Sequence, residues 1–283
     1  MTASTAISSC LVCGSGGRDA GVLQGILRQC GSCGFVWTAD ALGPAEDLYD
    51  ASYYREGGYE DYLVPVARRF EALRRVQWLR SFGHPATLVE AGSAAGFFVE
   101  AAGQAGVDAR GVEVSDAAAR YATDVLGVAV RQGRFETAAF DSPFDAVCAF
   151  HVLEHVERPR AFLDAAWNAL VPGGLLALEV PNISSPAARR LGTAWEGLQP
   201  EYHRWHFDRA SLTALVGERG FEVVGCDTAS FRFYMTPVYR RRHARRLLPA
   251  DVRNLRSWRL THPSRGDLLR LVARRPPAGQ GRR

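Results

Sequence analysis

Residues 87–116 carry the pattern that most constrains the fold. A short apolar run at 87–89 leads into Glu90 and a loop from Gly92 to Gly96, and residues 97–105 have helical character. A second apolar run at 111–114 contains Glu113 near its end. Strand, glycine turn, helix, strand and acid, in this order, form the nucleotide-binding half of a parallel α/β fold. We therefore predict an α/β protein with a Rossmann-like sheet.

The glycine loop also indicates which nucleotide it would bind. Gly92 and Gly96 lack Cβ atoms, so a ligand can lie against the backbone, and the N–H groups at the start of the next helix point towards it. Glu113 can accept hydrogen bonds from both hydroxyls of a ribose. Ala94 stands where a dinucleotide-binding loop has its second glycine, which disfavours a pyrophosphate. S-adenosylmethionine (SAM), with a ribose and no phosphate, fits better.

The segment from Glu90 to Gly96 resembles motif I of class I SAM-dependent methyltransferases, in which an acid precedes glycine, three residues and glycine. Ser93-Ala94 replaces the Cys-Gly or Ser-Gly that is usual inside that loop. The resemblance implies a seven-stranded sheet and methyl transfer from SAM. It also implies cofactor contacts from this region and from two later segments: Glu90, Gly92, Ser93, Gly96, Glu113, Val114, Phe135, Phe150 and His151.

Four of the six cysteines form two C-x-x-C pairs near the N-terminus: Cys10, Cys13, Cys30 and Cys33. Two pairs at this separation are typical of a zinc ribbon, in which four thiolates close a tetrahedral Zn²⁺ site. Gly14 and Gly34 follow the pairs and can take the positive φ of a tight knuckle. A substrate-activating zinc ion and a redox thiol pair are the alternatives. Because residues 10–33 carry only Arg18 and Arg28, we expect a brace or a substrate-domain element and no nucleic-acid partner.

Five tyrosines are crowded into residues 44–63: Tyr49, Tyr53, Tyr54, Tyr59 and Tyr62. They either pack a linker onto the core or form a substrate lid with polar phenol groups in an apolar wall. Together with the cysteine pairs, this segment resembles bacterial small-molecule methyltransferases with an N-terminal zinc-binding domain, including the deoxysugar C-methyltransferases. The resemblance implies that a lid tyrosine reaches the active site. Tyr53 and Tyr54 match the family motif, and Tyr54 is the candidate. The predicted domains are a zinc-ribbon module with its lid, 1–60, and a SAM-binding domain, 61–283.

Residues 144–150 have the apolar character of a central parallel strand and lead into His151-Val152-Leu153-Glu154-His155. Ligands bind beyond the carboxyl ends of such strands, and on a following helix the side chains of His151, Glu154 and His155 would share one face. The segment resembles the H-x-L-E-H of many class I methyltransferases, which implies SAM contacts for its first residues and a catalytic base at His155. A structural role, or a metal site of Glu154, His155 and a third ligand, are alternatives. Phe135 either stacks on the adenine or belongs to the core.

A helix at 161–170, a Pro-Gly-Gly turn and a fifth strand at 175–180 are expected next, followed by an aromatic-rich insertion around 183–207. We expect this insertion to lie over the cofactor's methyl group as the acceptor pocket. Asp208 is the expected N-cap of a helix at 209–219. The family resemblance implies that His203 is a base or orients the acceptor; a surface or stacking histidine is the alternative. The deoxysugar enzymes have an acid just before this histidine, where this chain has Tyr202.

Basic residues are unevenly distributed. The chain has no lysine, and from Phe231 onward it has 15 arginines against two aspartates. The Arg-rich segment 238–259 is either a solvated helix, a site for a phosphorylated or carboxylated acceptor, or an RNA contact. Residues 267–274 are the expected closing seventh strand.

These features favour a SAM-dependent methyltransferase that acts on a small molecule, such as a bacterial secondary metabolite or a sugar intermediate. An RNA methyltransferase and a SAM-binding cyclase that no longer transfers methyl groups are the alternatives. No apolar run reaches membrane-spanning length, and the N-terminus has no basic or hydrophobic leader region. We therefore expect a cytoplasmic enzyme without a membrane partner, and the sequence gives no oligomeric state.

Overall fold

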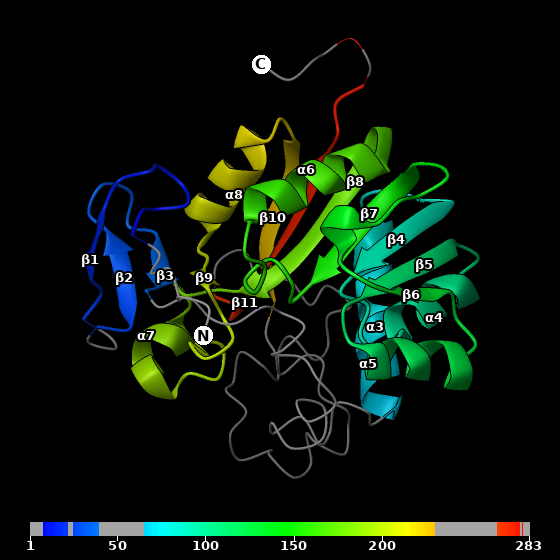
Figure 1. The fold of residues 1–283 in the computed structure, drawn as a ribbon, viewed down its shortest axis with the longest axis horizontal. Helices are drawn as coiled ribbons and strands as arrows, with labels where there is room; N and C mark the ends of the chain where they lie inside the picture. Colours follow the sequence, from blue (N-terminus) through cyan, green and yellow to red (C-terminus); the bar gives the residue numbers. More distant parts are fainter. Residues whose placement is uncertain (1–7, 22–24, 40–64, 230–264, 278, 280–283) are drawn as a thin grey trace.

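The computed structural model describes residues 8–21, 25–39, 65–229, 265–277 and 279. Two sheets organise this part of the chain: a large central sheet, and a small sheet that contains the N-terminal strands (Figure 1). The Tyr-rich segment with Tyr54 and the Arg-rich segment 238–259 lie outside the described residues. No helix within the described ranges is long and apolar enough to cross a membrane.

Seven strands form the central sheet: β4 (Thr87–Ala91), β5 (Asp108–Glu113), β6 (Val130–Gln132), β7 (Phe144–Phe150), β8 (Leu170–Pro181), β10 (Glu222–Ala229) and β11 (Leu268–Arg274). Their spatial order is β10-β11-β8-β7-β4-β5-β6. The strands from β4 to β8 pair in parallel, whereas β11 is antiparallel to both β8 and β10. This confirms the predicted Rossmann-like, seven-stranded sheet with a closing strand near residue 270.

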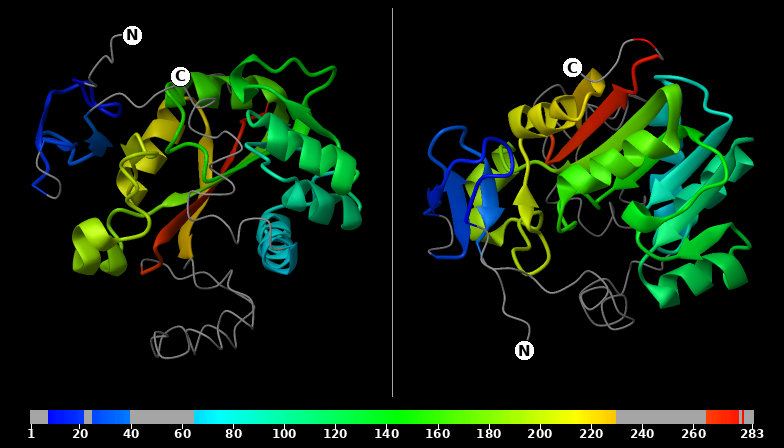
Figure 2. Two further views of the ribbon diagram at one scale, coloured as in Figure 1. Left: turned by 60° about the horizontal axis from the view of Figure 1, so that its bottom comes forward. Right: turned by 45° about the horizontal axis from the view of Figure 1, so that its top comes forward.

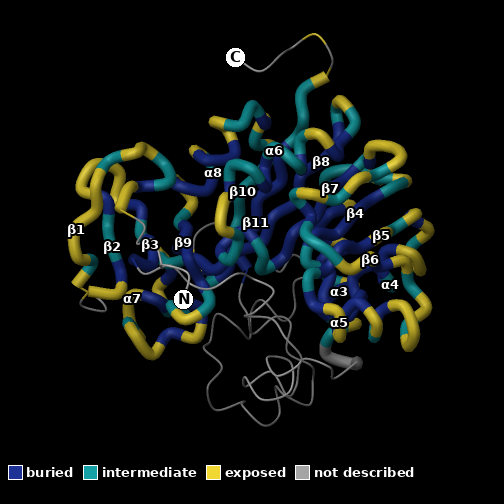
Figure 3. Tube along the Cα trace, viewed as in Figure 1, coloured by how far each residue is buried: buried dark blue, intermediate teal, exposed yellow. Residues whose placement is uncertain are grey.

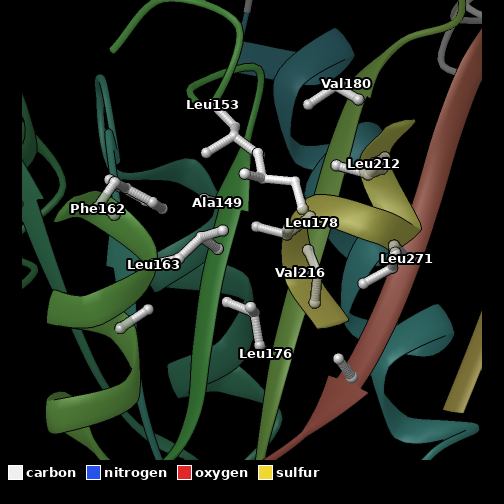
Figure 4. Close-up of a cluster of buried hydrophobic side chains, with 14 of the residues drawn as sticks. Ala149, Leu153, Phe162, Leu163, Leu176, Leu178, Val180, Leu212, Val216 and Leu271 are labelled. Carbon is white, nitrogen blue, oxygen red and sulfur yellow. The ribbon is translucent and has the colours of Figure 1, made fainter. Parts of the chain in front are cut away.

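Helices cover both faces of the central sheet (Figures 1 and 2). The helical elements are α3 (Pro65–Arg80), α4 (Phe97–Gln104), α5 (Asp116–Arg120), η2 (Tyr121–Val125), η3 (Phe135–Thr137), α6 (Pro159–Ala169), α7 (Pro186–Leu191), η4 (Gly192–Ala194) and α8 (Arg209–Glu218). Residues of α6 and α8 pack on β7 and β8 in one apolar cluster (Figure 4). Residues of α3 and α4 form a second cluster. The central strands are consequently buried along most of their length (Figure 3), as expected for parallel strands covered on two faces.

The segment after β7 is a turn and not the helix predicted around residues 151–155. His151 has a positive φ of 58°, which is outside the right-handed helical region. The helix begins later, with Pro159 in its first turn, a position that suits proline because its missing N–H is not needed there. The side chains of His151, Glu154 and His155 nevertheless converge. The predicted grouping is confirmed, although a turn and not a helix produces it.

Other boundaries differ less from the prediction. The helix expected over residues 116–126 is divided into α5 and the π-helical turn η2, and the strand expected at 128–130 begins at Val130. β8 is longer than expected because it includes the Pro-Gly-Gly segment, where Gly173 has a φ of 85°. Asp208 is the N-cap of α8, as predicted, and forms a capping box with Ser211.

The small sheet joins the cysteine-containing module to the main domain. β1 (Gly17–Asp19), β2 (Leu27–Cys30) and β3 (Val36–Thr38) form an antiparallel meander. The fourth strand, β9 (Trp205–His206), pairs with β3 and comes from the predicted acceptor-side insertion (Figure 1). Because one sheet contains both parts, the N-terminal module fixes the position of this insertion.

Candidate functional site

The glycine loop between β4 and α4 lies beside the turn that follows β7. Gly92, Ala94 and Gly96 have positive φ values of 66°, 45° and 82°. A Cβ on Gly92 would be 2.5 Å from Cγ2 of Val152, and a Cβ on Gly96 would be 2.8 Å from Cβ of Ala122. Both glycines are therefore required by backbone conformation and by neighbouring side chains. Protein atoms occupy the space at these two Cβ positions, so the structure gives a reason for glycine besides the predicted approach of a ligand to the backbone.

Glu113 reaches the glycine loop from the end of β5. Its Oε2 accepts a hydrogen bond from the Ala94 N–H at 2.7 Å, and its Oε1 accepts one from the Ser115 N–H at 2.9 Å. Burial raises the pKa of the Glu113 carboxyl, and these hydrogen bonds oppose the shift. Each carboxylate oxygen keeps a second lone pair. The side chain thus orders the loop and can still accept a hydroxyl group.

Glu90 and Phe150 lie near the ends of the neighbouring strands β4 and β7, and both are buried. Oε2 of Glu90 has no hydrogen-bond partner among the described residues. Burial raises the pKa of Glu90 to about 8, although Arg75 acts in the opposite direction. The Phe150 ring contacts Phe98 edge-on, with centroids 4.8 Å apart. Glu90 is therefore a buried acid with unused hydrogen-bonding capacity at the predicted cofactor site.

Phe135 belongs to a buried aromatic group. Its ring centroid is 6.0 Å from that of Phe140 and 5.3 Å from that of Phe162. These contacts favour the core alternative over adenine stacking. Ser93 is buried within the glycine loop and Val114 is half-buried after β5.

A buried charge network lies beside the site, and the sequence analysis did not identify it. Glu179 on β8 is 2.6 Å from Arg75 Nη2 and 2.8 Å from Arg270 Nε. Burial alone would raise the pKa of Glu179, but the two guanidinium groups hold it well below its usual range. His151 Nε2 is 3.4 Å from the same carboxylate and His151 Nδ1 is 3.3 Å from Glu154. Burial alone would lower the pKa of His151, but the two carboxylates raise it to about 9.

His155 and His203 come together although they were predicted from separate segments. Their rings meet edge-to-face with centroids 4.6 Å apart. Nδ1 of His155 donates to the Tyr202 carbonyl and Nδ1 of His203 donates to the Gly197 carbonyl, each at 3.1 Å. Burial lowers the pKa of both imidazoles. Both rings are therefore neutral near pH 7 and carry their lone pair on Nε2.

The Sγ atoms of four cysteines lie within 4.8 Å of one another: Cys10, Cys13, Cys30 and Cys33. The closest pairs are 3.3 and 3.5 Å apart, well beyond the S–S bond length of about 2.05 Å, so these four cysteines form no disulfide with one another. The glycine after each pair has a positive φ, 74° and 78°, as predicted for the knuckles. Four sulfur donors in this arrangement fit a tetrahedral Zn²⁺ ion.

The cysteine-containing module also holds the main chain of His203. The Thr38 hydroxyl donates to the His203 carbonyl at 2.6 Å, and the Thr38 N–H donates to the Arg204 carbonyl at 2.9 Å. Phe35 stacks on Trp205 with ring centroids 6.2 Å apart. The position of His203 thus depends on the fold of the module.

The topology of the central sheet, the glycine loop and the acid at the end of β5 define a class I methyltransferase fold. The family described as "Methyltransferase domain" matches residues 66–225. The chain belongs to this family and is a SAM-dependent enzyme. A search of curated proteins finds no match.

Solved structures share the fold at low sequence identity. A SAM-dependent methyltransferase from Thermotoga maritima, described as a possible histamine N-methyltransferase, has 20% identity and a TM-score of 0.55, covering 79% of this chain and 97% of that chain. Magnesium protoporphyrin IX methyltransferase from Synechocystis has 17% identity and a TM-score of 0.54, with the same coverage of 79% and 97%. The [4+2]-cyclase SpnF has 18% identity and a TM-score of 0.53, covering 74% and 81%. At these identities the similarity shows the fold alone.

Proposed function

We propose that the protein transfers the methyl group of SAM to a small-molecule acceptor, such as a secondary metabolite or a sugar intermediate. The observation that carries the proposal is the position of the Nε2 lone pairs of His155 and His203. His155 lies in the turn that contains Val152, and Val152 packs against Gly92 of the glycine loop. Proton-accepting groups and the predicted cofactor loop therefore lie at one edge of the sheet, as methyl transfer to a hydroxyl, amine or carbon acid requires.

SAM supplies a methyl group that is already activated by the adjacent sulfonium. We assign its nucleoside to the glycine loop, with the ribose hydroxyls on the remaining lone pairs of Glu113. The other assigned contacts surround this loop: Glu90, Gly92, Ser93, Gly96, Val114, Phe150 and His151. Phe135 is assigned to the core instead of to adenine stacking, because its ring packs against Phe140 and Phe162.

The protein's own contribution is to align the acceptor and to accept its proton. Holding the acceptor in line with the methyl group supplies most of the rate enhancement, because the methyl donor needs no further activation. Nε2 of His155 or His203 accepts the acceptor's proton. Tyr54, outside the described residues, is assigned to the acceptor side on the basis of the family resemblance alone.

Zn²⁺ is assigned to the four cysteines as a structural ion. The module is small and, among its described residues, buries few apolar side chains besides its cysteines: Leu27, Phe35, Trp37 and Ala39. Metal binding would therefore supply part of its folding free energy. Four protein ligands leave no open position on the ion, which supports a structural role over activation of a substrate.

Calorimetry with SAM tests the cofactor assignment directly. Glu113→Gln should weaken SAM binding by about ten- to a hundredfold, since a hydrogen bond to a charged group contributes about 1.5–3 kcal/mol. Asp108→Asn is the matched control, because Asp108 is exposed at the opposite end of the same strand, and it should bind SAM like the wild type. If the wild type binds no SAM, the proposal fails.

Product analysis separates methyl transfer from the alternatives. Candidate metabolites incubated with SAM should give methylated products by mass spectrometry and equimolar S-adenosylhomocysteine. A cyclase remains the second candidate because of the fold shared with SpnF, and it would convert its substrate without releasing S-adenosylhomocysteine. An RNA methyltransferase would show RNA binding that weakens steeply with salt.

A further inference from the structure

A second cluster of metal-binding groups lies on the acceptor side of the fold. Glu154 and His155 belong to the turn after β7, and His203 lies two residues before β9. One ligand atom from each residue lies within 4.8 Å of the others. This cluster is separate from the four cysteines and shares no residue with them.

The tautomers of both histidines suit metal binding. A backbone carbonyl can only accept a hydrogen bond, so the contacts with the Tyr202 and Gly197 carbonyls place the proton of each ring on Nδ1. The lone pair is therefore on Nε2 in both His155 and His203. A metal-binding histidine usually donates its other ring N–H to a carbonyl or carboxylate in this way, which fixes both the tautomer and the ring orientation.

Glu154 is the buried carboxylate of this cluster. The residue is 1% exposed, and neither of its carboxylate oxygens forms a hydrogen bond among the described residues. The closest ring nitrogens are His151 Nδ1 at 3.3 Å and His155 Nε2 at 3.9 Å, both measured to Oε1. The His151 imidazole, whose pKa the carboxylates of Glu154 and Glu179 raise, lies beside Oε1 of Glu154. The remaining lone pairs of the Glu154 carboxylate can bind a metal ion.

We propose that Glu154, His155 and His203 bind a divalent transition-metal ion at the acceptor site. Two imidazoles and one carboxylate form a ligand set that Zn²⁺ and Fe²⁺ use in sites with open coordination positions. The His155 side chain is 12% exposed, whereas Glu154 and His203 are buried. The open positions would face the methyl acceptor.

The inference rests on the proposed methyl transfer and changes how the acceptor loses its proton. Without the ion, Nε2 of either histidine can accept the acceptor's proton, as proposed above. With the ion bound, both Nε2 atoms are ligands, and the ion activates the acceptor in their place. A hydroxyl group of the acceptor bound to the ion has a lowered pKa and releases its proton to solvent. The resulting oxygen attacks the methyl carbon: the O–C bond forms, the C–S bond breaks, and the electron pair remains on sulfur as S-adenosylhomocysteine. The acceptor class is therefore a hydroxyl compound that can chelate or bind a metal ion.

Cobalt titration of the metal-free wild-type protein tests the site without an identified substrate. We expect two Co²⁺ ions per chain. One ion should show the intense sulfur-to-metal charge-transfer bands of the cysteine site, and the second should show d–d bands without them. Binding of a single ion, with the sulfur bands, would overturn the inference.

Two matched pairs of variants locate the second ion. Glu154→Gln and His203→Gln should each reduce the stoichiometry from two to one and leave the sulfur bands unchanged. Glu157→Gln, in the same turn but exposed, and His206→Gln, a buried histidine outside the cluster, should retain both ions. Two ions in both cluster variants would refute the assignment. Near-ultraviolet circular dichroism shows whether a variant has unfolded. If one has, the number of Co²⁺ ions bound by the wild type, two or one, decides whether the second site exists.

The same measurements keep this inference distinct from the proposed function. If methyl transfer proceeds at an unchanged rate with one ion per chain, the metal inference fails and the proposed function stands. If two ions bind but SAM does not, the proposed function fails and the metal site stands.

Discussion

Several carboxylates form ion pairs among the described residues. Of these, Glu179 is the one whose neutralisation should destabilise the protein most. Glu179 is 0% exposed, and Arg270 beside it is 2% exposed. Glu179→Gln keeps the size of the side chain but leaves the guanidinium groups of Arg75 and Arg270 with less compensating negative charge inside the fold. Removal of one partner from a buried ion pair costs about 3–5 kcal/mol because the remaining charge is uncompensated. We expect a loss in this range.

Urea unfolding at pH 7 with saturating zinc measures this loss. The control is Glu218→Gln, which removes the ion pair of Glu218 with Arg160; the two side chains there are 42% and 38% exposed. An exposed pair contributes at most about 1 kcal/mol. A double variant, Glu179→Gln with Arg270→Met, should recover part of the lost free energy of unfolding, because it also removes a guanidinium group that has lost its carboxylate partner. Equal destabilisation by Glu179→Gln and Glu218→Gln would refute the reasoning.

The pH dependence of the same variant gives a second test. The pKa of Glu179 is lower in the folded state than the value of about 4.3 in an unfolded chain. Its contribution to stability is therefore present above about pH 4.3 and is lost as the pH falls towards the folded-state pKa. The difference in unfolding free energy between wild type and Glu179→Gln should shrink below pH 4. A constant difference down to pH 2 would contradict this.

Three smaller changes test other parts of the structure. Burial raises the pKa of Glu90 to about 8, so the SAM-free wild type should lose stability as the pH rises from about 4.3 to 8. Glu90→Gln should not show this loss when the melting temperatures at pH 5 and pH 9 are compared. Gly96→Ala should lower the free energy of unfolding in urea by about 1–3 kcal/mol more than Gly106→Ala does. Both glycines have a positive φ, but only Gly106 has open space at its Cβ position. An equal loss in the two variants would exclude the packing argument. Thr38→Val should cost about 1–3 kcal/mol, since it leaves the His203 carbonyl without its hydroxyl donor, and an unchanged denaturation midpoint would contradict this.

The cofactor half of the fold was predictable because its signals are local. A strand, glycine turn, helix and second strand follow one another within 87–116, and each is recognisable from short-range periodicity and from Gly92 and Gly96. The order of the strands in space then follows from the parallel α/β architecture. Glu113 was predicted to accept hydrogen bonds from a ribose bound at this loop, and its hydrogen bond from the Ala94 N–H shows that its carboxylate lies beside the loop.

The charge network was missed although the sequence contains a signal for it. Glu179 lies within the apolar run 175–180, and Arg270 lies within the apolar run 268–273. A charged residue inside a buried strand must be compensated by an opposite charge. Which residues compensate it depends on the register of β8 with β11, in which Arg270 pairs with Glu179, and on Arg75 in α3. Contacts of this kind are set by tertiary structure, which periodicity does not report.

The histidine cluster shows the same division between local and long-range information. The H-x-L-E-H segment and His203 were each identified from the sequence, but nothing in either segment indicates that their rings meet. Their contact requires the turn at His151, whose positive φ is not predictable from a histidine. It also requires the pairing of β9 with β3. β9 has only two residues, and β3 lies more than 160 positions earlier in the chain. Short strands of this kind have no periodicity of their own.

The pairing of β9 with β3 connects the N-terminal module to the acceptor side through a short physical path. The knuckles of the cysteine site fix the end of β2, β2 pairs with β3, and Thr38 at the end of β3 holds the His203 carbonyl. None of these contacts involves the glycine loop or Glu113. Loss of order in the module should therefore displace His203 while the predicted SAM site keeps its structure. This separation gives the module a physical reason to be part of the enzyme: it positions the groups that meet the acceptor, and the central sheet positions the cofactor.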